Sequence, residues 1–431
     1  MFSAPEHLTS RLIRLTFSTL TKDFTLSHGL PNCSFRVRFF VVHIIVSEKF
    51  PILSIMEKTI CMDNEQKWGK HYDTHSLYGH SMAIVTKNTL EELFPDRRSF
   101  VLTRSQFAGT GHYAGHWLGD NQSNWPNLGW SIVGMLEYSL FGFSYTGADI
   151  CGFWFNATET MCSRWSQLGA FYPYSRNHNG IGWRDQHPPA MGQLVVDSAK
   201  QALTTRYTLL PTLYTLMYES TNEGATTVRS LMAEFQDDRN ARDCSDQFLW
   251  GRGFMIAPIL EEHVNSRGVY FPGHNWFNYY TNEPIKGQTS QVVTVDATTI
   301  PLFVRDDTIL IEQEPELTTT AQSDNDMTMK VYTSDSDRVR GSLFWDNGEA
   351  PLAKNEHLYM SYALARSGTS GTLSASCEKC QDFSVILSRV KFIGSIVTSA
   401  EIDGEVMTIE NNALIIDKPI SDQWSIILTF E

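Results

Sequence analysis

The feature that most constrains the fold of this chain is the alternation of short apolar runs with helix-like segments across residues 58–228. Residues 99–103 form an apolar run that ends at Arg104, and residues 143–148 form another that leads to Asp149. Alternating strands and helices favour a parallel sheet covered by helices. In barrels of this kind, functional side chains follow the carboxyl ends of the strands, which is where both polar residues stand.

Helical periodicity is clear in two segments of this stretch. Residues 130–138 carry apolar side chains at helical spacing, and residues 197–221 predict a long helix with Leu203 and Tyr207 on its apolar face. Pro211 should kink that helix, because proline lacks an amide hydrogen and clashes with the preceding turn.

The stretch 229–431 predicts β-structure, because its Val, Ile, Thr and Tyr runs are interrupted by Gly, Asp and Asn. Residues 269–271 are expected to form a short aromatic strand. Residues 341–348 predict a strand that runs into the Asn-Gly turn of a hairpin. Residues 1–57, by contrast, show no convincing periodicity.

The charge of the chain excludes one class of partner. The formal net charge is −14, from 34 Lys and Arg against 48 Asp and Glu. An acidic chain repels a phosphate backbone, so nucleic acid is not an expected partner.

The seven cysteines bear on the compartment. Cys377 and Cys380 form a Cys-x-x-Cys, but a zinc site would require a second pair at similar spacing, and the sequence contains none. A disulfide is the better interpretation of Cys151 and Cys162, and it predicts an oxidising compartment.

Targeting signals are weak. Arg11, Arg14 and Lys22 interrupt the N-terminal segment, so no clear signal peptide is present. The apolar run 39–46 is too short to cross a bilayer, which requires about 20 residues. Three N-glycosylation sequons agree with a secreted glycoprotein, although such triplets also arise by chance. They begin at Asn32, Asn121 and Asn156.

The densest cluster of polar residues runs from Arg104 to Asn121, and Asp120 stands in it between Gly119 and Asn121. Trp117 could lower the local dielectric and raise the pKa of the Asp120 carboxyl, as a general acid requires. Arg104 could hold a substrate hydroxyl or set the local field. From the Gly-Asp-Asn triplet alone, a plain turn is the more common explanation.

Two further polar residues follow strand-like segments. Asp149 could accept paired sugar hydroxyls, or it could cap the helix that follows. His178 lies among amide side chains able to orient its ring, although an isolated histidine is more often structural.

A histidine-rich segment raises the question of a metal site. In the run from His71 to His75, alternate side chains would lie on one face of a strand and could chelate zinc or iron, with His80 beyond. Nothing in the sequence supplies groups to orient such ligands, and the spacing is common. No metal is expected.

Taken together, five motifs in order resemble glycoside hydrolase family 31, and within it the α-glucosidases of the maltase-glucoamylase and sucrase-isomaltase type. The resemblance runs from about Lys58 to the C-terminus. The motifs are Arg-Ser-x-Phe-Ala-Gly, His-Trp-x-Gly-Asp-Asn, Gly-Ala-Asp-Ile-Cys-Gly-Phe, Arg-Trp-x-Gln-Leu-Gly-Ala-Phe-Tyr-Pro and Arg-Asn-His-Asn.

The resemblance implies an α/β fold in which a partial (β/α)8 TIM barrel covers residues 58–228. Two C-terminal antiparallel β-sandwich domains follow, a proximal one over 229–308 and a distal one over 309–431. Residues 1–57 are left as an unmatched segment.

The resemblance also implies hydrolysis of terminal α-linked glucose with retention of configuration, without a cofactor. It makes Asp120 the general acid/base and pairs Cys151 with Cys162 in a disulfide. The residues that it places around the first glucose are Arg104, Trp117, Asp149, Phe153 and His178.

One element of the family is missing. A retaining mechanism needs two carboxyl groups about 5–5.5 Å apart. The family nucleophile lies in a Trp-x-Asp-Met-Asn-Glu motif that this sequence does not contain. The run Met62-Asp63-Asn64-Glu65 matches a different family segment, so Asp63 is not the expected nucleophile. We therefore expect this chain to carry only the acid/base half of the catalytic pair, as a truncated isoform or a partial gene model would.

Three hypotheses remain: an α-glucosidase-type hydrolase by descent, a catalytically inactive carbohydrate-binding derivative, and a β-rich interaction protein in which the barrel remnant is only structural. The expected ligands are α-glucosides, such as malto- or isomalto-oligosaccharides or sucrose-like disaccharides. The expected location is the secretory pathway (extracellular, cell-surface or lysosomal), with membrane attachment only through segments absent from this chain.

Overall fold

The computed structural model describes residues 59–334, 336–354 and 357–431. The chain forms two compact units, Met1–His75 and Ser76–Glu431. The sequon at Asn32 and the apolar run 39–46 lie outside the described residues. The division into domains at 58–228, 229–308 and 309–431 stays a prediction.

The described part of the first unit begins with a short hairpin. β1 (Glu65–Gln66) pairs antiparallel with β2 (Gly69–Lys70), and the helical turns α1 (His71–Thr74) and η1 (His75–Leu77) follow. The expected strand across the histidine-rich segment is therefore wrong. The chain becomes helical after β2, and in a helix residues four apart lie on the same face. Nε2 of His71 therefore lies 3.0 Å from Nδ1 of His75.

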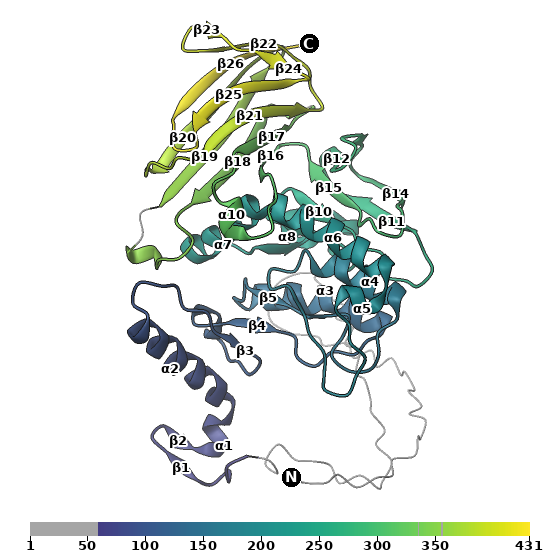
Figure 1. The fold of residues 1–431 in the computed structure, drawn as a ribbon, viewed down its shortest axis with the longest axis vertical. Coiled ribbons are helices and arrows are strands. Elements are labelled where there is room, and N and C mark those ends of the chain that lie inside the picture. Colours follow the sequence, from purple (N-terminus) through teal and green to yellow (C-terminus); the bar gives the residue numbers. More distant parts are fainter. Residues whose placement is uncertain (1–58, 335, 355–356) are drawn as a thin grey trace, which may run out of the picture. The chain divides into compact units, whose positions relative to one another are not determined.

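A helix over residues 78–93 begins the second unit, and a parallel sheet in two parts, one of three strands and one of two, follows it, as the alternating pattern predicts (Figure 1). Its strands are short and follow one another in chain order. They are β3 (Leu102–Thr103), β4 (Gly115–Trp117), β5 (Thr146–Gly147), β6 (Asp149–Ile150) and β7 (Arg176–Asn177).

The two parts of this sheet are joined by a backbone hydrogen bond from the Tyr174 amide to the Thr146 carbonyl, 3.0 Å long. Gly147 permits this approach, because a Cβ there would lie 1.9 Å from the Tyr174 carbonyl oxygen. The three strands β3, β4 and β5 and the two strands β6 and β7 therefore lie next to one another as separately paired groups.

Helices separate the strands and extend beyond them. The Asn124 side chain caps α3 by accepting a hydrogen bond from the Asn127 amide. The long helix expected over 197–221 is present but broken at Leu209, and Pro211 stands in the first turn of the second part. The helices are α2 (Tyr78–Leu93), α3 (Trp125–Leu140), α4 (Glu159–Gly169), α5 (Pro188–Met191), α6 (Gln193–Thr208) and α7 (Leu210–Glu223).

A six-stranded antiparallel sheet follows within the described residues, in the order β13-β12-β15-β10-β9-β8, beside the antiparallel pair β11–β14. The aromatic strand expected at 269–271 is the end of β11. The strands are β8 (Val228–Ser230), β9 (Phe248–Trp250), β10 (Phe254–Ile256), β11 (Ser266–Phe271), β12 (Trp276–Asn278), β13 (Pro284–Ile285), β14 (Thr289–Thr294) and β15 (Leu302–Arg305). The short helices are α8 (Leu231–Glu234) and α9 (Arg239–Arg242).

The described residues from 308 onward form an eleven-stranded curled sheet, green to yellow in Figure 1, which we call the distal sheet. Its order is β23-β22-β26-β20-β19-β18-β16-β17-β21-β25-β24. The strands are β16 (Thr308–Gln313), β17 (Met327–Tyr332), β18 (Arg338–Trp345), β19 (Leu358–Ser367), β20 (Ser370–Lys379), β21 (Ile386–Ile393), β22 (Val397–Ile402), β23 (Glu405–Val406), β24 (Ile409–Glu410), β25 (Ala413–Pro419) and β26 (Trp424–Phe430). The helix α10 (Thr319–Gln322) joins β16 to β17.

The distal sheet differs from the expectation in two details. The pairs β16–β18 and β17–β21 are parallel. Parallel neighbours need a connection that returns the chain to the end of the sheet where the first strand began, and the strands between them in the sequence provide it. β18 and β19 do pair antiparallel, but residues 346–357 connect them, so Asn347-Gly348 starts a long loop rather than closing a two-residue turn.

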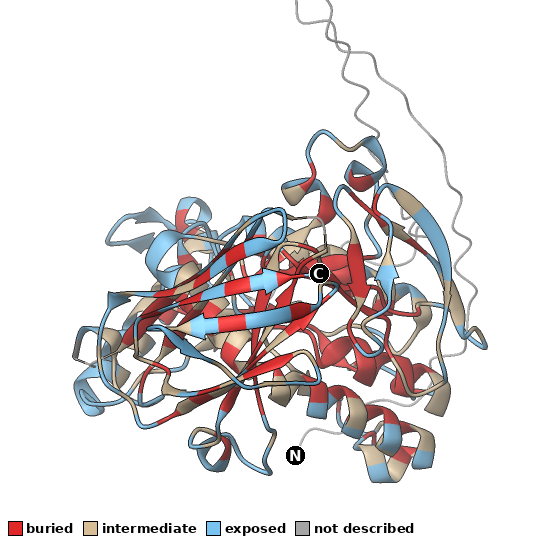
Figure 2. Ribbon diagram, turned by 90° about the horizontal axis from the view of Figure 1, so that it is seen from above, coloured by how far each residue is buried: buried red, intermediate tan, exposed pale blue. Residues whose placement is uncertain are grey.

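One core cluster joins the α/β part to the six-stranded sheet and includes Leu310, Tyr332 and Ile393 of the distal sheet. Most other buried apolar side chains of the distal sheet form a core cluster of their own. In Figure 2 its strands alternate buried and exposed positions, as expected of a sheet with one face inward. In the described ranges no helix is both long and apolar enough to cross a membrane.

Candidate active site

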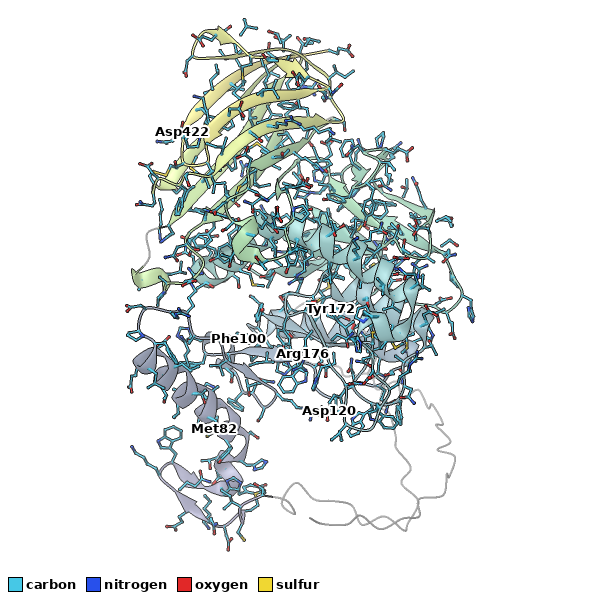
Figure 3. The ribbon with its side chains drawn as sticks, viewed as in Figure 1. Met82, Phe100, Asp120, Tyr172, Arg176 and Asp422 are labelled. Carbon is cyan, nitrogen blue, oxygen red and sulfur yellow. A yellow bond between two sulfur atoms is a disulfide. The ribbon has the colours of Figure 1, made fainter. Side chains whose placement is uncertain are left out.

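Five polar and aromatic residues stand at or just after the carboxyl ends of β3, β4, β5 and β7. Arg104 follows β3, Trp117 ends β4, and Asp120 comes three residues later. Asp149 begins β6, and His178 directly follows β7. Figure 3 labels Asp120 on this side of the sheet. This is the edge at which parallel α/β barrels carry their functional side chains.

Arg104 and Asp120 form an ion pair at the open side of the site. Nη1 of Arg104 lies 3.6 Å from Oδ2 of Asp120, and their side chains are 60% and 30% exposed. Gly119 makes the approach possible, because its φ is +80° and a Cβ there would lie 2.6 Å from Nε of Arg104. A reachable carboxyl group beside a fixed positive charge can exchange a proton with a ligand.

Asp149 and Arg176 form a second and deeper ion pair. Asp149 is 1% exposed, and its Oδ1 accepts hydrogen bonds from Nε of Arg176, at 3.0 Å, and from Nη2. Burial raises the pKa of Asp149, and the guanidinium of Arg176 works against that shift. The alternative role of Asp149 as a helix cap is excluded, because Thr158 caps α4.

Two buried polar atoms beside this pair lack a hydrogen-bond partner within the described residues. They are Oδ2 of Asp149, an acceptor, and Nε1 of Trp117, a donor. Buried polar groups in native proteins are nearly always satisfied, so each such atom needs an explanation. A bound hydroxyl-rich ligand would supply partners to both.

Trp117 lies against Arg176. The guanidinium of Arg176 stands 5.2 Å from the centre of the Trp117 ring and 5.5 Å from that of Tyr174. Cation–π contacts of this kind hold the guanidinium in place for its ion pair. The structure gives Trp117 this contact with Arg176, and its expected action on Asp120 stays a prediction.

Asn121 connects the two sides of the site. Its Nδ2 donates to the carbonyl of Asp149 at 2.9 Å, and its Oδ1 accepts from the amide of Phe153 at 3.1 Å. The ring of Phe153 lies 5.4 Å from that of His178, which is exposed. The charges of His178 and Asp120 both act on the pKa of Asp149, so the predicted residues lie close enough to influence one another.

His116 supports the site from the interior. It is buried, stacks on Tyr138 with ring centres 3.8 Å apart, and its Nε2 lies 3.2 Å from the carbonyl oxygen of Arg104. Burial lowers its pKa to about 4, so the ring is neutral at physiological pH. A neutral ring is suited to hold the Arg104 backbone in position.

Sequence reasoning passed over three residues of this arrangement. Arg176 stands two positions before His178 in a quoted motif, but a charge in a short strand is ordinarily solvent-exposed. Asn121 was noted only as a sequon and as part of a turn. His116 begins the His-Trp-x-Gly-Asp-Asn motif, but its supporting role follows only from its burial and its stacking on Tyr138.

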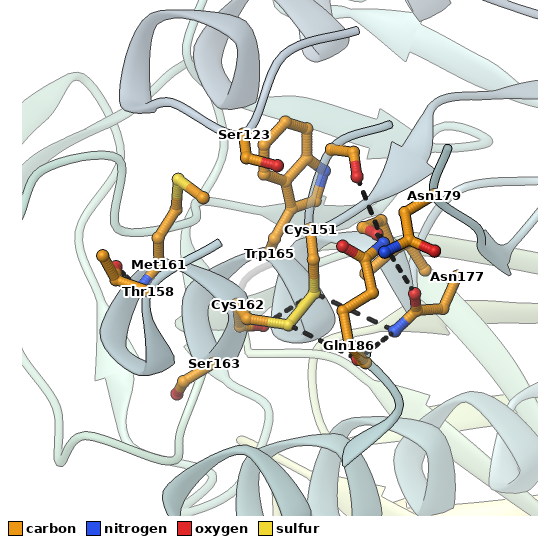
Figure 4. Close-up of a disulfide and its surroundings, with 12 residues drawn as sticks. Ser123, Cys151, Thr158, Met161, Cys162, Ser163, Trp165, Asn177, Asn179 and Gln186 are labelled. Carbon is orange, nitrogen blue, oxygen red and sulfur yellow. Dashed lines mark hydrogen bonds between the residues drawn. A yellow bond between two sulfur atoms is a disulfide. The ribbon is translucent and has the colours of Figure 1, made fainter. Parts of the chain in front are cut away.

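The loop after β6 is fastened by a disulfide between Cys151 and Cys162, both of which are buried (Figure 4). Nδ2 of the Asn177 side chain donates to the backbone carbonyl of Gln186 at 2.9 Å, and Nε2 of the Gln186 side chain donates to the backbone carbonyl of Gly152 at 3.1 Å. These bonds hold the loops that follow β6 and β7 together, and with them Phe153 and His178.

Other cysteines and histidines in the described part of the chain have different contacts. Cys377 and Cys380 form a second disulfide, in the distal sheet. His71 contacts Thr59, Gln66 and His75. Over the ranges that the structure describes, no three His, Cys, Asp or Glu side chains form a group able to hold a metal ion.

Two family models match the chain. The model for the glycosyl hydrolases family 31 TIM-barrel domain matches residues 38–216, and the model for the family 31 C-terminal domain matches residues 224–310. The chain belongs to glycoside hydrolase family 31. The barrel match begins inside the 1–57 segment that the motifs left unmatched, so the family 31 sequence reaches further toward the N-terminus than the motifs indicate.

Curated relatives are similar over most of this chain. Intestinal sucrase-isomaltase of Homo sapiens is 45% identical over 323 residues, which is 74% of this chain and 18% of the relative. Lysosomal alpha-glucosidase of Rattus norvegicus is 37% identical over 316 residues, 69% of this chain and 33% of the relative. This family 31 chain therefore spans one third or less of the length of these relatives.

Solved structures share the fold. The Flavobacterium johnsoniae dextranase FjDex31A with glucose has a TM-score of 0.77 at 20% identity, covering 85% of this chain and 50% of the dextranase chain. The endoplasmic-reticulum glucosidase II complex has a TM-score of 0.78 at 23% identity, covering 86% of this chain and 44% of its own. The similarity agrees with a family 31 barrel portion followed by β domains.

Proposed function

We propose that this chain carries the acid/base half of an α-glucosidase active site and binds the terminal glucose of α-glucosides. Asp120 would protonate the leaving glycosidic oxygen and later take a proton from water. The residues that would surround the glucose are Arg104, Trp117, Asp149, Phe153 and His178. Arg176 is a positioning residue for Asp149.

The observation that carries the proposal is that two buried atoms, Oδ2 of Asp149 and Nε1 of Trp117, have no hydrogen-bond partner among the described residues. A sugar offers hydroxyls that donate and accept hydrogen bonds, so a single glucose can satisfy both atoms. Phe153 and His178 would supply an aromatic wall. Asp120 is 30% exposed in its side chain, which leaves it reachable by the bond to be broken.

The proposed reaction is incomplete within this chain. Asp149 is buried and engaged by Arg176, so it is not free to attack an anomeric carbon. The nucleophile motif of the family is absent from the sequence. We therefore expect glucose binding without turnover by the chain alone, which makes a carbohydrate-binding derivative the second candidate function.

Substrate and location follow from the relatives. The named relatives are an intestinal sucrase-isomaltase, a lysosomal alpha-glucosidase and a dextranase, so we propose malto- or isomalto-oligosaccharides or sucrose-like disaccharides as ligands. The two disulfides suit an oxidising compartment, and we propose the secretory pathway.

The test is to incubate the purified 431-residue chain with 4-nitrophenyl α-glucoside and with maltose, and to measure glucose binding by calorimetry. We expect no hydrolysis above the buffer blank and a measurable binding heat. His178→Ala should weaken glucose binding about tenfold, the effect of losing one hydrogen bond to a polar ligand.

The matched control is His263→Ala, because the His263 side chain is 79% exposed and lies outside the site. It should leave binding unchanged. Hydrolysis that is lost in Asp120→Asn would show that the chain contains its own nucleophile and would overturn the incomplete-site proposal. Absence of glucose binding at any concentration would favour an interaction protein instead.

A further inference from the structure

We propose that Asn156 carries an N-linked glycan in the folded protein, and that Asn121 does not. Both residues begin an Asn-x-Ser/Thr sequon, the first with Ala157 and Thr158 and the second with Gln122 and Ser123. Sequence alone does not separate them. Their surroundings in the fold do.

The side chain of Asn156 is exposed, and only one end of its amide is engaged. Its Oδ1 accepts a hydrogen bond from the backbone amide of Arg184 at 2.7 Å. Its Nδ2 has no hydrogen bond to any residue that the structure describes. The atom to which a glycan attaches is therefore free, while the oxygen beside it is held.

Asn156 stands in a loop with a fixed geometry. The Cys151–Cys162 disulfide closes this loop at its buried base. Phe155 adopts a left-handed conformation, with a φ of 72°, at the position before Asn156. A glycan at Asn156 would consequently project from a defined place in the loop that also carries Phe153.

Exposed aromatic rings flank the acceptor. Trp154 and Phe155 are 41% and 49% exposed, and the Phe155 ring lies 5.3 Å from that of Trp183. The apolar face of the first sugar ring can pack on such a surface and cover it. A covered surface explains why large apolar side chains stand in solvent at this loop.

Asn121 has the opposite surroundings. It is half-buried, its Nδ2 donates to the carbonyl of Asp149, and its Oδ1 accepts from the amide of Phe153. A sugar on Nδ2 would have to occupy space between these two backbone segments. A chain glycosylated at Asn121 could not assemble the candidate active site.

The modification is a group transfer from a polyprenyl-diphosphate-linked oligosaccharide. A carbon–nitrogen bond forms between Nδ2 of Asn156 and the anomeric carbon of the first N-acetylglucosamine. The bond from that carbon to the diphosphate oxygen breaks, the lipid diphosphate leaves, and Nδ2 loses one proton. No oxidant or reductant takes part. The inference depends on passage through the secretory pathway and is independent of any hydrolase activity.

The experiment is to express the whole chain behind a cleavable leader in a eukaryotic secretory host and to isolate the protease-resistant chain from the medium or from the secretory compartments. Glycans are then released enzymatically in ¹⁸O-labelled water, which converts each glycosylated Asn to labelled Asp. Peptide mass spectrometry should find the label at position 156 in most molecules and none at position 121.

Variants in an Asn32→Gln background isolate the two sites, because Asn32 begins a sequon outside the described residues. Asn156→Gln should remove the mass of one glycan, and Asn121→Gln should leave the mass unchanged. An unlabelled Asn156, or a labelled Asn121 in the protease-resistant chain, would overturn the proposal. Since the leader forces entry into the pathway, neither result bears on glucose binding or hydrolysis.

Discussion

The parallel sheet and the distal sheet bury their side chains in different ways. The core cluster of the distal sheet consists entirely of residues between 309 and 430, because the sheet curls over its own inner face. The parallel sheet ends at β3, and the rings of Phe100 and Tyr145 beside it are 58% and 38% exposed. Among the described residues, β3 is an edge strand and these two side chains stay partly exposed beside it, whereas the distal sheet covers the apolar side chains of its inner face.

The same difference separates structural from functional side chains. The distal core is apolar and its positions follow strand alternation. The carboxyl ends of the parallel strands instead carry the buried carboxylate of Asp149, paired with the half-buried Arg176, and unsatisfied polar atoms. The distal sheet has a comparable pair, Glu312 with Lys330, beside its large apolar core. We infer that the site region depends on polar pairing for stability more than the distal sheet does.

The strongest test of this contrast is to remove the partner of the buried carboxylate. Arg176→Met should lower the free energy of unfolding by about 3–5 kcal/mol, because it leaves the charge of Asp149 buried without a partner. Urea denaturation measures the loss. Amide hydrogen exchange should show reduced protection near β6 and unchanged protection in β20.

The control for this variant is Arg104→Met at the exposed pair. Arg104 is 60% exposed in its side chain, so losing its ion pair with Asp120 should cost less than about 1 kcal/mol. Equal losses for the two arginine variants would contradict the distinction between a buried and an exposed pair. The double variant Asp149→Asn with Arg176→Met should recover part of the loss.

A smaller effect is expected from the buried histidine under the site. Its folded-state pKa is about 4, below the value of about 6.5 in an unfolded chain, so between these values the unfolded state binds more protons. The free energy of unfolding should therefore fall as the pH falls from about 6.5 to 4, by up to about 3 kcal/mol. Urea denaturation across this pH range measures the slope.

His116→Phe keeps an aromatic ring stacked on Tyr138 but cannot take up a proton. The difference in unfolding free energy between this variant and the parent chain should change with pH across the stated window. Carboxyl groups elsewhere contribute equally to both chains and cancel. Parallel curves for the two proteins would mean that His116 is as accessible to protons in the folded state as in the unfolded state.

The smallest effect is expected at the uncovered face of the parallel sheet. Phe100→Ala should cost about 1 kcal/mol or less, because the side chain is already 58% exposed and loses little burial. Leu373→Ala in β20 of the distal sheet, where the side chain is fully buried, should cost about 2–5 kcal/mol. If both substitutions lower the free energy of unfolding by the same amount, then Phe100 is buried in solution. The two sheets would then not differ in how they cover their apolar side chains.

Much of the fold follows from local sequence pattern. Alternating strands and helices, the break near Pro211 and the β-rich character of residues 229–431 all rest on periodicity and on proline geometry. Expectations based on single short motifs were less reliable. The strand across His71 is a helical turn, and Asn347-Gly348 opens a long loop, because neighbouring elements decide how a few residues are used.

For the candidate site, the sequence by itself determined which residue types occur and that Arg104 and His178 each follow a strand. The prediction of Asp120 and of the glucose-binding residues rested only on the five motifs and their order in the sequence. The tertiary structure alone decided that Arg176 pairs with Asp149 and that Asn121 is engaged at both ends of its amide, whereas Asn156 is engaged only at Oδ1. It also decided that Oδ2 of Asp149 has no hydrogen-bond partner among the described residues. The physical reason is that burial and hydrogen bonding depend on segments far apart in the chain, and these meet only when the parallel strands lie side by side.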